Sequence, residues 1–165
     1  MLQILLPGQG RCPKDGGVNN SIHLHLMPRI LAIDYGQKRI GVAVTDPLQL
    51  IANGLTTVET PKIYSFLAEY FAKEEVETIV VGYPKTLQNQ PAEVTKYINT
   101  FVGKLRKLYP DKKIELIDER FTSKMAFQTM IDSGINKKAR QNKALIDQIS
   151  ATIILQNYLE SMHNS

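Results

Sequence analysis

Short apolar runs alternate with amphipathic segments along most of this chain. Runs at 30–33 and 40–45, and a weaker one at 55–59, are joined by short polar connections, which favours three antiparallel strands. Two later runs, 78–81 and 114–117, each follow a segment with helical spacing, and strands that alternate with helices pair in parallel. The pattern predicts an α/β fold on a five-stranded mixed sheet, three antiparallel strands then two parallel ones, with helices on both faces.

Apolar residues recur at helical spacing in the segments between and after these strands. The helical segments run from Ile63 to Phe71, from Val94 to Leu108, from Met125 to Ile131 and from Ala144 to Leu159. Prolines stand just before the first two, and Pro110 ends the second. We therefore expect helices over all four segments.

Residues 1–26 differ from the rest, because Pro, Gly and Asn are scattered through them without a sustained period. A signal peptide is not indicated, since a basic start is missing and the apolar stretch is short. We expect residues 1–26 to be a disordered extension and residues 27–165 to form a single domain, a size that buries a sufficient core.

Bulk composition narrows the class of protein only slightly. No apolar run approaches the length of a membrane span, so we expect no membrane partner. The single Cys12 cannot form an intramolecular disulfide, which fits a cytoplasmic location. With 20 Lys and Arg against 16 Asp and Glu, the net charge of +4 favours an anionic partner weakly.

Three acidic positions fall where the predicted sheet would bind a ligand. Asp34 ends the first strand, Asp118 and Glu119 end the last, and Asp147 shares the inward stripe of the final helix. Several carboxylates without a Cys or His cluster suit Mg²⁺ or Mn²⁺, and two such ions would clamp a phosphodiester. The pattern thus predicts a metal-dependent phosphodiesterase site.

Each acid also has an ordinary explanation. Asp34 could form a turn with Gly36, and Asp147 could be a first-turn acid of its helix. Asp118 or Glu119 could pair with Arg120 or favour the N-terminus of the next helix. The occurrence of all three at one predicted edge favours the metal site.

Basic residues surround the same positions, as the binding of a polyanion requires. Arg39 could instead orient Asp34, and Arg120 could orient Glu119, through ion pairs. A solvated surface is the alternative for any one lysine. The candidate phosphate-binding residues are Lys38, Arg39, Arg120, Lys124, Lys137, Lys138, Arg140 and Lys143.

Four segments of the chain, taken together, have a recognisable order and spacing: "ILAIDYGQKRIGVAV", "IVVGYPKTLQNQPAE", "IDERFTSKMA" and "KALIDQISATIIL". They resemble the YqgF family of bacterial RuvC-like nucleases, and the similarity runs from about residue 29 to residue 159. The resemblance implies an RNase H-like fold and a site in which Asp34, Glu119 and Asp147 hold the metal. Asp118 is a possible substitute for Glu119, and the choice stays open.

The same resemblance implies a role in maturing the 5′ end of 16S rRNA, and hence in ribosome biogenesis. Members are also named Holliday junction resolvases by likeness to RuvC. Structured RNA or branched DNA would then be the substrate, a pre-ribosomal particle a partner, and the protein a monomer or a homodimer. The chain departs mildly from the family pattern at Gly82-Tyr83-Pro84, where Tyr83 would pack against a base or sugar, and at "DERFTS".

Two hypotheses that assign the chain to other functional classes remain. A phosphotransferase of the actin and sugar-kinase type also opens on an Asp-x-Gly hairpin, but it needs two such domains. A non-catalytic RNA-binding factor for ribosome assembly would keep the fold, yet it gains nothing from buried carboxylates.

Overall fold

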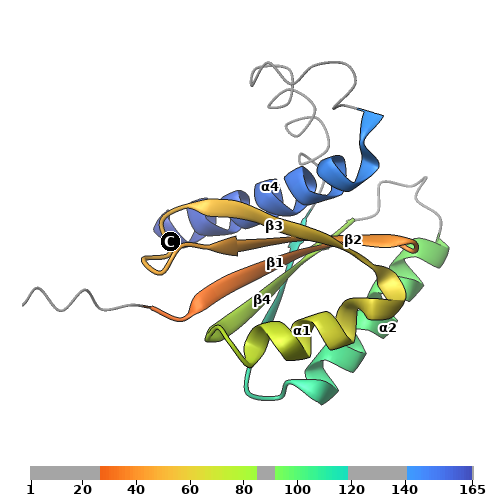
Figure 1. Cartoon of the computed structure of the whole chain (residues 1–165), viewed down its shortest axis with the longest axis horizontal. Helices are drawn as coiled ribbons and strands as arrows, with labels where there is room; N and C mark the ends of the chain where they lie inside the picture. Colours follow the sequence, from red (N-terminus) through yellow and green to blue (C-terminus); the bar gives the residue numbers. More distant parts are fainter. Residues whose placement is uncertain (1–26, 85–91, 119–140, 165) are drawn as a thin grey trace, which may run out of the picture.

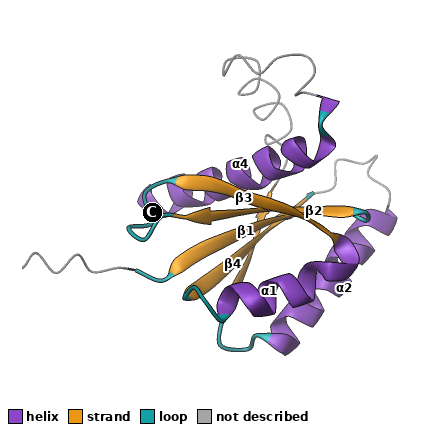
Figure 2. Cartoon of the chain, viewed as in Figure 1, coloured by secondary structure: helices purple, strands orange, loops and turns teal. Residues whose placement is uncertain are grey.

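The computed structural model describes residues 27–84, 92–118 and 141–164. The expected extension 1–26 and the expected helix around 125–131 lie outside this range. In chain order the elements are β1 (Arg29–Tyr35), β2 (Arg39–Thr45), β3 (Ala52–Glu59), a 3₁₀ turn (Thr60–Lys62), α1 (Ile63–Phe71), β4 (Val76–Tyr83), α2 (Ala92–Leu108), β5 (Lys113–Asp118) and α4 (Lys143–His163). Figure 2 shows strands and helices alternating in the second half of the chain.

The five strands form one mixed sheet in the order β3-β2-β1-β4-β5, with β1 at its centre. The first three strands pair antiparallel, and β4 and β5 continue from β1 in parallel. The predicted sheet is therefore confirmed. Because β1, β4 and β5 run in the same direction, their carboxyl ends meet at one edge.

Helices cover both faces of this sheet, α1 and α2 on one and α4 on the other (Figure 1). Alternate residues of β1 divide between the two cores. Leu31 and Ile33 belong to a cluster with α1 and α2, whereas Ile30 and Ala32 pack in a smaller cluster with α4. The face on which a strand residue lies can therefore be read from its neighbours.

The final helix, α4, begins at a capped N-terminus and lies close to the sheet. The Asn142 carboxamide oxygen accepts hydrogen bonds from the backbone N–H groups of Ala144 and Leu145, which would otherwise lack partners. Small residues on both sides of the contact, Ala43 in β2 and Ala151 in α4, permit the close approach. In the described part of the chain, neither α4 nor any other helix has the length and apolarity needed to cross a membrane.

Candidate active site

The first predicted acid, Asp34, is half-buried near the carboxyl end of β1, on the face that α4 covers. Two observations place it there. Along β1 it follows Ile30 and Ala32 in the alternation that packs against α4. Across the sheet it lies opposite Gly41 of β2, and directly opposed residues of an antiparallel pair project from the same face.

At Gly41 the backbone of α4 lies directly against β2. A Cβ atom at this position would collide with the backbone carbonyl of Asp147 and lie 3.1 Å from the amide nitrogen of Gln148. The missing side chain therefore lets the backbone of Asp147 rest on the strand beside Asp34. Glycine 41 brings together two of the predicted acids that are distant in sequence.

Arg39 holds the side chain of Asp147 at this edge. Its Nε donates to Asp147 Oδ2 at 3.0 Å, and the two side chains are 36% and 27% exposed. The sequence suggested Arg39 as a partner for Asp34; the structure shows an ion pair from Arg39 to the helical acid. Because both groups are partly exposed, the pair fixes orientation more than it adds stability.

Asp118 lies on the other face of the sheet from Asp34. In β5, Ile114 packs on the cluster beneath α1 and α2, and Ile117 packs on the α4 cluster. Alternation then places Asp118 on the α1 and α2 face. Its register partner Tyr83 is partly buried against the same larger cluster, so this predicted nucleic-acid contact also lies away from α4.

The third predicted metal ligand, Glu119, lies outside the described residues, directly after β5. Among the residues that are described, no group of three or more acids, histidines or cysteines converges on a point that could hold a metal ion. Asp34 and Asp147 therefore supply two of the three predicted carboxylates, and the described structure leaves the full set untested.

Of the predicted phosphate-binding bases, Lys38 and Lys143 are exposed near these two acids. Lys38 lies in the β1–β2 turn, and Lys143 begins α4 one turn before Asp147. A cation at each position faces solvent beside the predicted site. The remaining candidates, Arg120, Lys124, Lys137, Lys138 and Arg140, fall outside the described ranges.

Two threonines that the sequence reasoning missed fix the surroundings of the site. Thr57 Oγ1 of β3 donates to the carbonyl oxygen of Ala144 at 2.6 Å and ties the first turn of α4 to the sheet. Thr60 Oγ1 donates to the carbonyl oxygen of Gly36 at 2.7 Å and ties the β1–β2 turn to the segment after β3. The local sequence around Thr57 in β3 and Thr60 in the following turn gave no signal for either contact.

The matches to known proteins span nearly all of the described residues. The family model for RuvX, a Holliday junction resolvase, matches residues 28–161. A relative from Flavobacterium johnsoniae is 61% identical over 135 residues, which make up 82% of this chain and 98% of the relative. One from Phocaeicola vulgatus is 62% identical over 135 residues, 82% of this chain and 97% of the relative. Both carry the name "Putative pre-16S rRNA nuclease".

Among solved structures, that of Thermus thermophilus RuvC matches with a TM-score of 0.52 at 15% sequence identity. The match covers 82% of this chain and 96% of the RuvC chain. At this identity the likeness concerns the fold, and it agrees with the RNase H-like arrangement expected from the sequence.

Proposed function

Because the chain belongs to the RuvX family of Holliday junction resolvases and is thus a nuclease, we propose that it hydrolyses structured RNA at the 5′ end of the 16S rRNA precursor. The observation that carries this proposal is the approach of Asp34 and Asp147 across Gly41. RNA is favoured as the substrate by the name that both of these relatives carry. The reaction would take place in the cytoplasm, which fits a chain with a single cysteine.

We further propose that Asp34, Asp147 and Glu119 hold Mg²⁺ or Mn²⁺. The described donors fit this role, since both are carboxylates and hard divalent cations prefer oxygen ligands. A pair of such ions would supply a hydroxide nucleophile and neutralise the leaving oxygen. Glu119 is preferred to Asp118 because the latter belongs to the opposite face of the sheet.

The residues of the chain have separate tasks in this hydrolysis. Arg39 orients the carboxylate of Asp147, and the exposed ammonium groups of Lys38 and Lys143 position the phosphates on either side of the scissile one. Water adds to phosphorus and the bond to the 3′ oxygen breaks, which leaves a 5′-phosphate and a 3′-hydroxyl. The two lysines would thus offset the negative charge of the phosphates beside the site, while the carboxylates would hold the metal ions.

Resolution of a four-way DNA junction is the second candidate. The description of the family and the RuvC-like fold favour it. Symmetric resolution would require two coordinated active sites, and therefore a homodimer, whereas trimming an RNA leader requires only one.

A cleavage assay on two substrates tests these proposals. Full-length protein is incubated with an RNA carrying the 5′ leader of 16S rRNA, or with a four-way DNA junction, in Mg²⁺, in Mn²⁺ or in EDTA. We expect cleavage of the RNA with either ion and none in EDTA. The Asp34→Asn variant, purified in parallel, controls for contaminating nucleases.

The other possible results would each contradict one of these proposals. Paired nicks in the junction with intact RNA would replace the RNA substrate by the DNA junction. Cleavage that persists in EDTA would contradict the metal site. If the wild type binds RNA but does not cleave it in either ion, the protein would instead be a non-catalytic RNA-binding factor for ribosome assembly.

Replacing Arg39 by methionine is expected to lower the rate of cleavage by about 10- to 100-fold, a range typical for loss of a group that orients a metal ligand. Methionine keeps much of the length of the side chain and removes the donor to Asp147. Arg39→Lys should rescue poorly, because an ammonium lacks the planar fork of a guanidinium. Single-turnover cleavage at saturating protein measures the effect.

Lys62→Met is the matched control for loss of a surface ion pair. Lys62 binds Glu59 at 2.6 Å, and both side chains are well exposed. Cleavage should be unchanged in this variant. If the Arg39→Met enzyme cleaves as fast as the wild type, the carboxylate of Asp147 does not depend on Arg39 for its orientation.

A further inference from the structure

In the loop between β2 and β3, residues 46–51, apolar side chains are exposed and a polar side chain is buried. Gln49 is only 7% exposed, whereas its neighbours Leu50 and Ile51 are 62% and 59% exposed and Leu48 is 38% exposed. Scattered apolar side chains are common on protein surfaces. Here three aliphatic residues within four positions face solvent while the one amide among them is buried.

The hydrogen bonds of the loop impose this arrangement. The Asp46 carboxylate accepts from the backbone N–H groups of Leu50 and Ile51, both at 2.8 Å, and from that of Leu48 at 3.2 Å. These bonds lower the pKa of Asp46 below its ordinary value. Since the carboxylate holds the backbone at Leu48, Leu50 and Ile51, the exposure of these aliphatic side chains follows from the hydrogen bonds of the loop.

Gln49 locks the loop from within. It adopts a left-handed backbone conformation with φ of 56°, and its Nε2 donates to the carbonyl oxygen of Pro28 and to Glu77 Oε1, each at 2.6 Å. A non-glycine residue in this conformation needs such compensating contacts. The loop is therefore anchored to the segments that begin β1 and β4.

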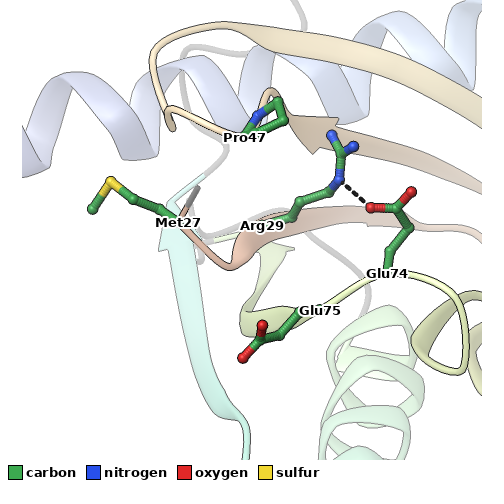
Figure 3. A pocket seen from close by; sticks show the side chains of 5 residues that line it. All are labelled: Met27, Arg29, Pro47, Glu74 and Glu75. Atoms are coloured by element: carbon green, nitrogen blue, oxygen red, sulfur yellow. Dashed lines mark hydrogen bonds and ion pairs between the residues drawn. The ribbon is translucent and has the colours of Figure 1, made fainter. Parts of the chain in front are cut away.

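A small cavity of about 250 Å³ adjoins the loop at Pro47 (Figure 3). It is lined by Met27, Arg29, Pro47, Glu74 and Glu75. The backbone N–H of Met27 donates to the carbonyl oxygen of Pro47 at 2.8 Å, and the Met27 side chain is 47% exposed. We call Met27, Leu48, Leu50 and Ile51 the apolar knuckle.

Acidic groups surround the apolar knuckle, although the whole chain carries a net charge of +4. Arg29 in the cavity is already paired, its Nε with Glu74 at 2.7 Å and its Nη1 with the carbonyl oxygen of Thr45. Glu75 and Glu77 are exposed nearby, and Asp46 lies in the loop itself. Three lysines lie close by: Lys73 is exposed and offsets one of these charges, whereas Lys112 and Lys113 are paired with the further acids Asp111 and Glu115.

This surface lies at the end of the sheet opposite the candidate active site. Arg29 begins β1 and Asp34 stands near its end, roughly 17 Å apart at the rise of a strand. Phosphates would be repelled by the carboxylates around the apolar knuckle. Nucleic acid is therefore a poor occupant of this surface.

The fold also disfavours a second copy of the chain here. A two-fold contact would bring the same acids of both copies face to face. The neighbouring edge strand β3 contains a bulge, because Val42 pairs with Thr56 and Ala43 with Gly54, which leaves Leu55 as an extra residue. Bulged edges pair poorly with further strands.

We propose that the apolar knuckle binds a segment of another protein that carries aliphatic or aromatic side chains flanked by lysine or arginine. The aliphatic side chains would supply the buried contact area, and the carboxylates around them would select a basic partner. This role is independent of catalysis, so its success or failure leaves the proposed function untouched.

A fluorescent peptide of alternating lysine and leucine pairs serves as the probe, and its glutamate–leucine counterpart is the control for charge. We expect the lysine peptide to bind the full chain and the glutamate peptide not to bind. The double variant Leu50→Ser, Ile51→Ser should weaken binding at least about tenfold, equivalent to about 1.4 kcal/mol. Fluorescence anisotropy measures binding, and RNA cleavage by the double variant should equal that of the wild type.

Leu108→Ser is the matched control, because Leu108 is 49% exposed at the end of α2 and lies outside the apolar knuckle. It should bind the lysine peptide like the wild type. Equal weakening in both variants, equal affinity for both peptides, or no binding of the lysine peptide would overturn the proposal.

Two other occupants are tested on the full chain. Cys12 is the only cysteine and lies within residues 1–26, so a spin label can be attached there. Selective broadening of the methyl resonances of Leu48, Leu50 and Ile51 would identify that segment as the occupant. A dimer in sedimentation that becomes monomeric in the double variant would identify a second copy, and either result would overturn the proposal.

Discussion

Gly41→Ala is expected to destabilise the protein by about 3 kcal/mol, the upper part of the range for overpacking a core, and to abolish cleavage. The added methyl group would collide with the carbonyl of Asp147, which is backbone and cannot rotate away. Helix α4 must then move off β2, which loosens the packing of Ala151 and Ile154 and separates Asp147 from Asp34. Thermal unfolding should show a midpoint lower by roughly 10 °C.

Gly103→Ala is the control for adding a methyl group at a glycine. A Cβ at Gly103 in α2 meets nothing within 4 Å. Alanine favours a helix by about 0.5–1 kcal/mol over glycine, so this variant should be slightly more stable and fully active. A Gly41→Ala protein with wild-type stability would mean that α4 does not rest on β2 at this point.

Asp34→Asn is expected to reduce the rate of cleavage by about a thousandfold, while the fold and the affinity for RNA persist. Asparagine has the same shape but no negative charge, and several kcal/mol of transition-state stabilisation by a metal correspond to about two to four decades in rate. Single-turnover cleavage gives the rate, and filter binding without divalent ions gives the affinity. Affinity should not fall, because the variant removes a carboxylate that repels phosphate.

Asp118→Asn makes the same chemical change on the opposite face of the sheet. It should retain most of the cleavage activity, and the thermal midpoints of both variants should stay near that of the wild type. Loss of activity in Asp118→Asn with a functional Asp34→Asn enzyme would transfer the metal site to the other face. That pattern would remove the basis for grouping Asp34 with Asp147.

Hydrophobic periodicity was sufficient to predict the sheet and the order of its elements. The run from Ile30 to Ile33 and that from Thr78 to Val81 mark strands buried on both faces, and Leu31 and Ile79 within them are fully buried. Asp34 could be found because a carboxylate in such a run is costly unless it is paired or bound. Asp147 was found because it shares the inward stripe with Ala151.

The contacts between these elements could not be predicted from periodicity. Gly41 sits in a strand where a glycine usually signals only weakness or a bulge, and its role depends on where α4 crosses. The partner of Arg39 depends on the same crossing. The exposure of aliphatic side chains in the β2–β3 loop could not be predicted either. It arises from the hydrogen bonds of Asp46 and Gln49, which leave no regular pattern in the sequence.

The position of α4 has a consequence for synthesis of the protein on the ribosome. Asp34 is translated early and Asp147 near the end of the described chain, and domains fold progressively from the N-terminus as they emerge. The strands can pair first, but the face holding Asp34 remains uncovered until α4 leaves the exit tunnel and settles on Gly41. A nascent chain would therefore lack the juxtaposed acids, and an RNA-cutting activity would be withheld from the ribosome that is making it.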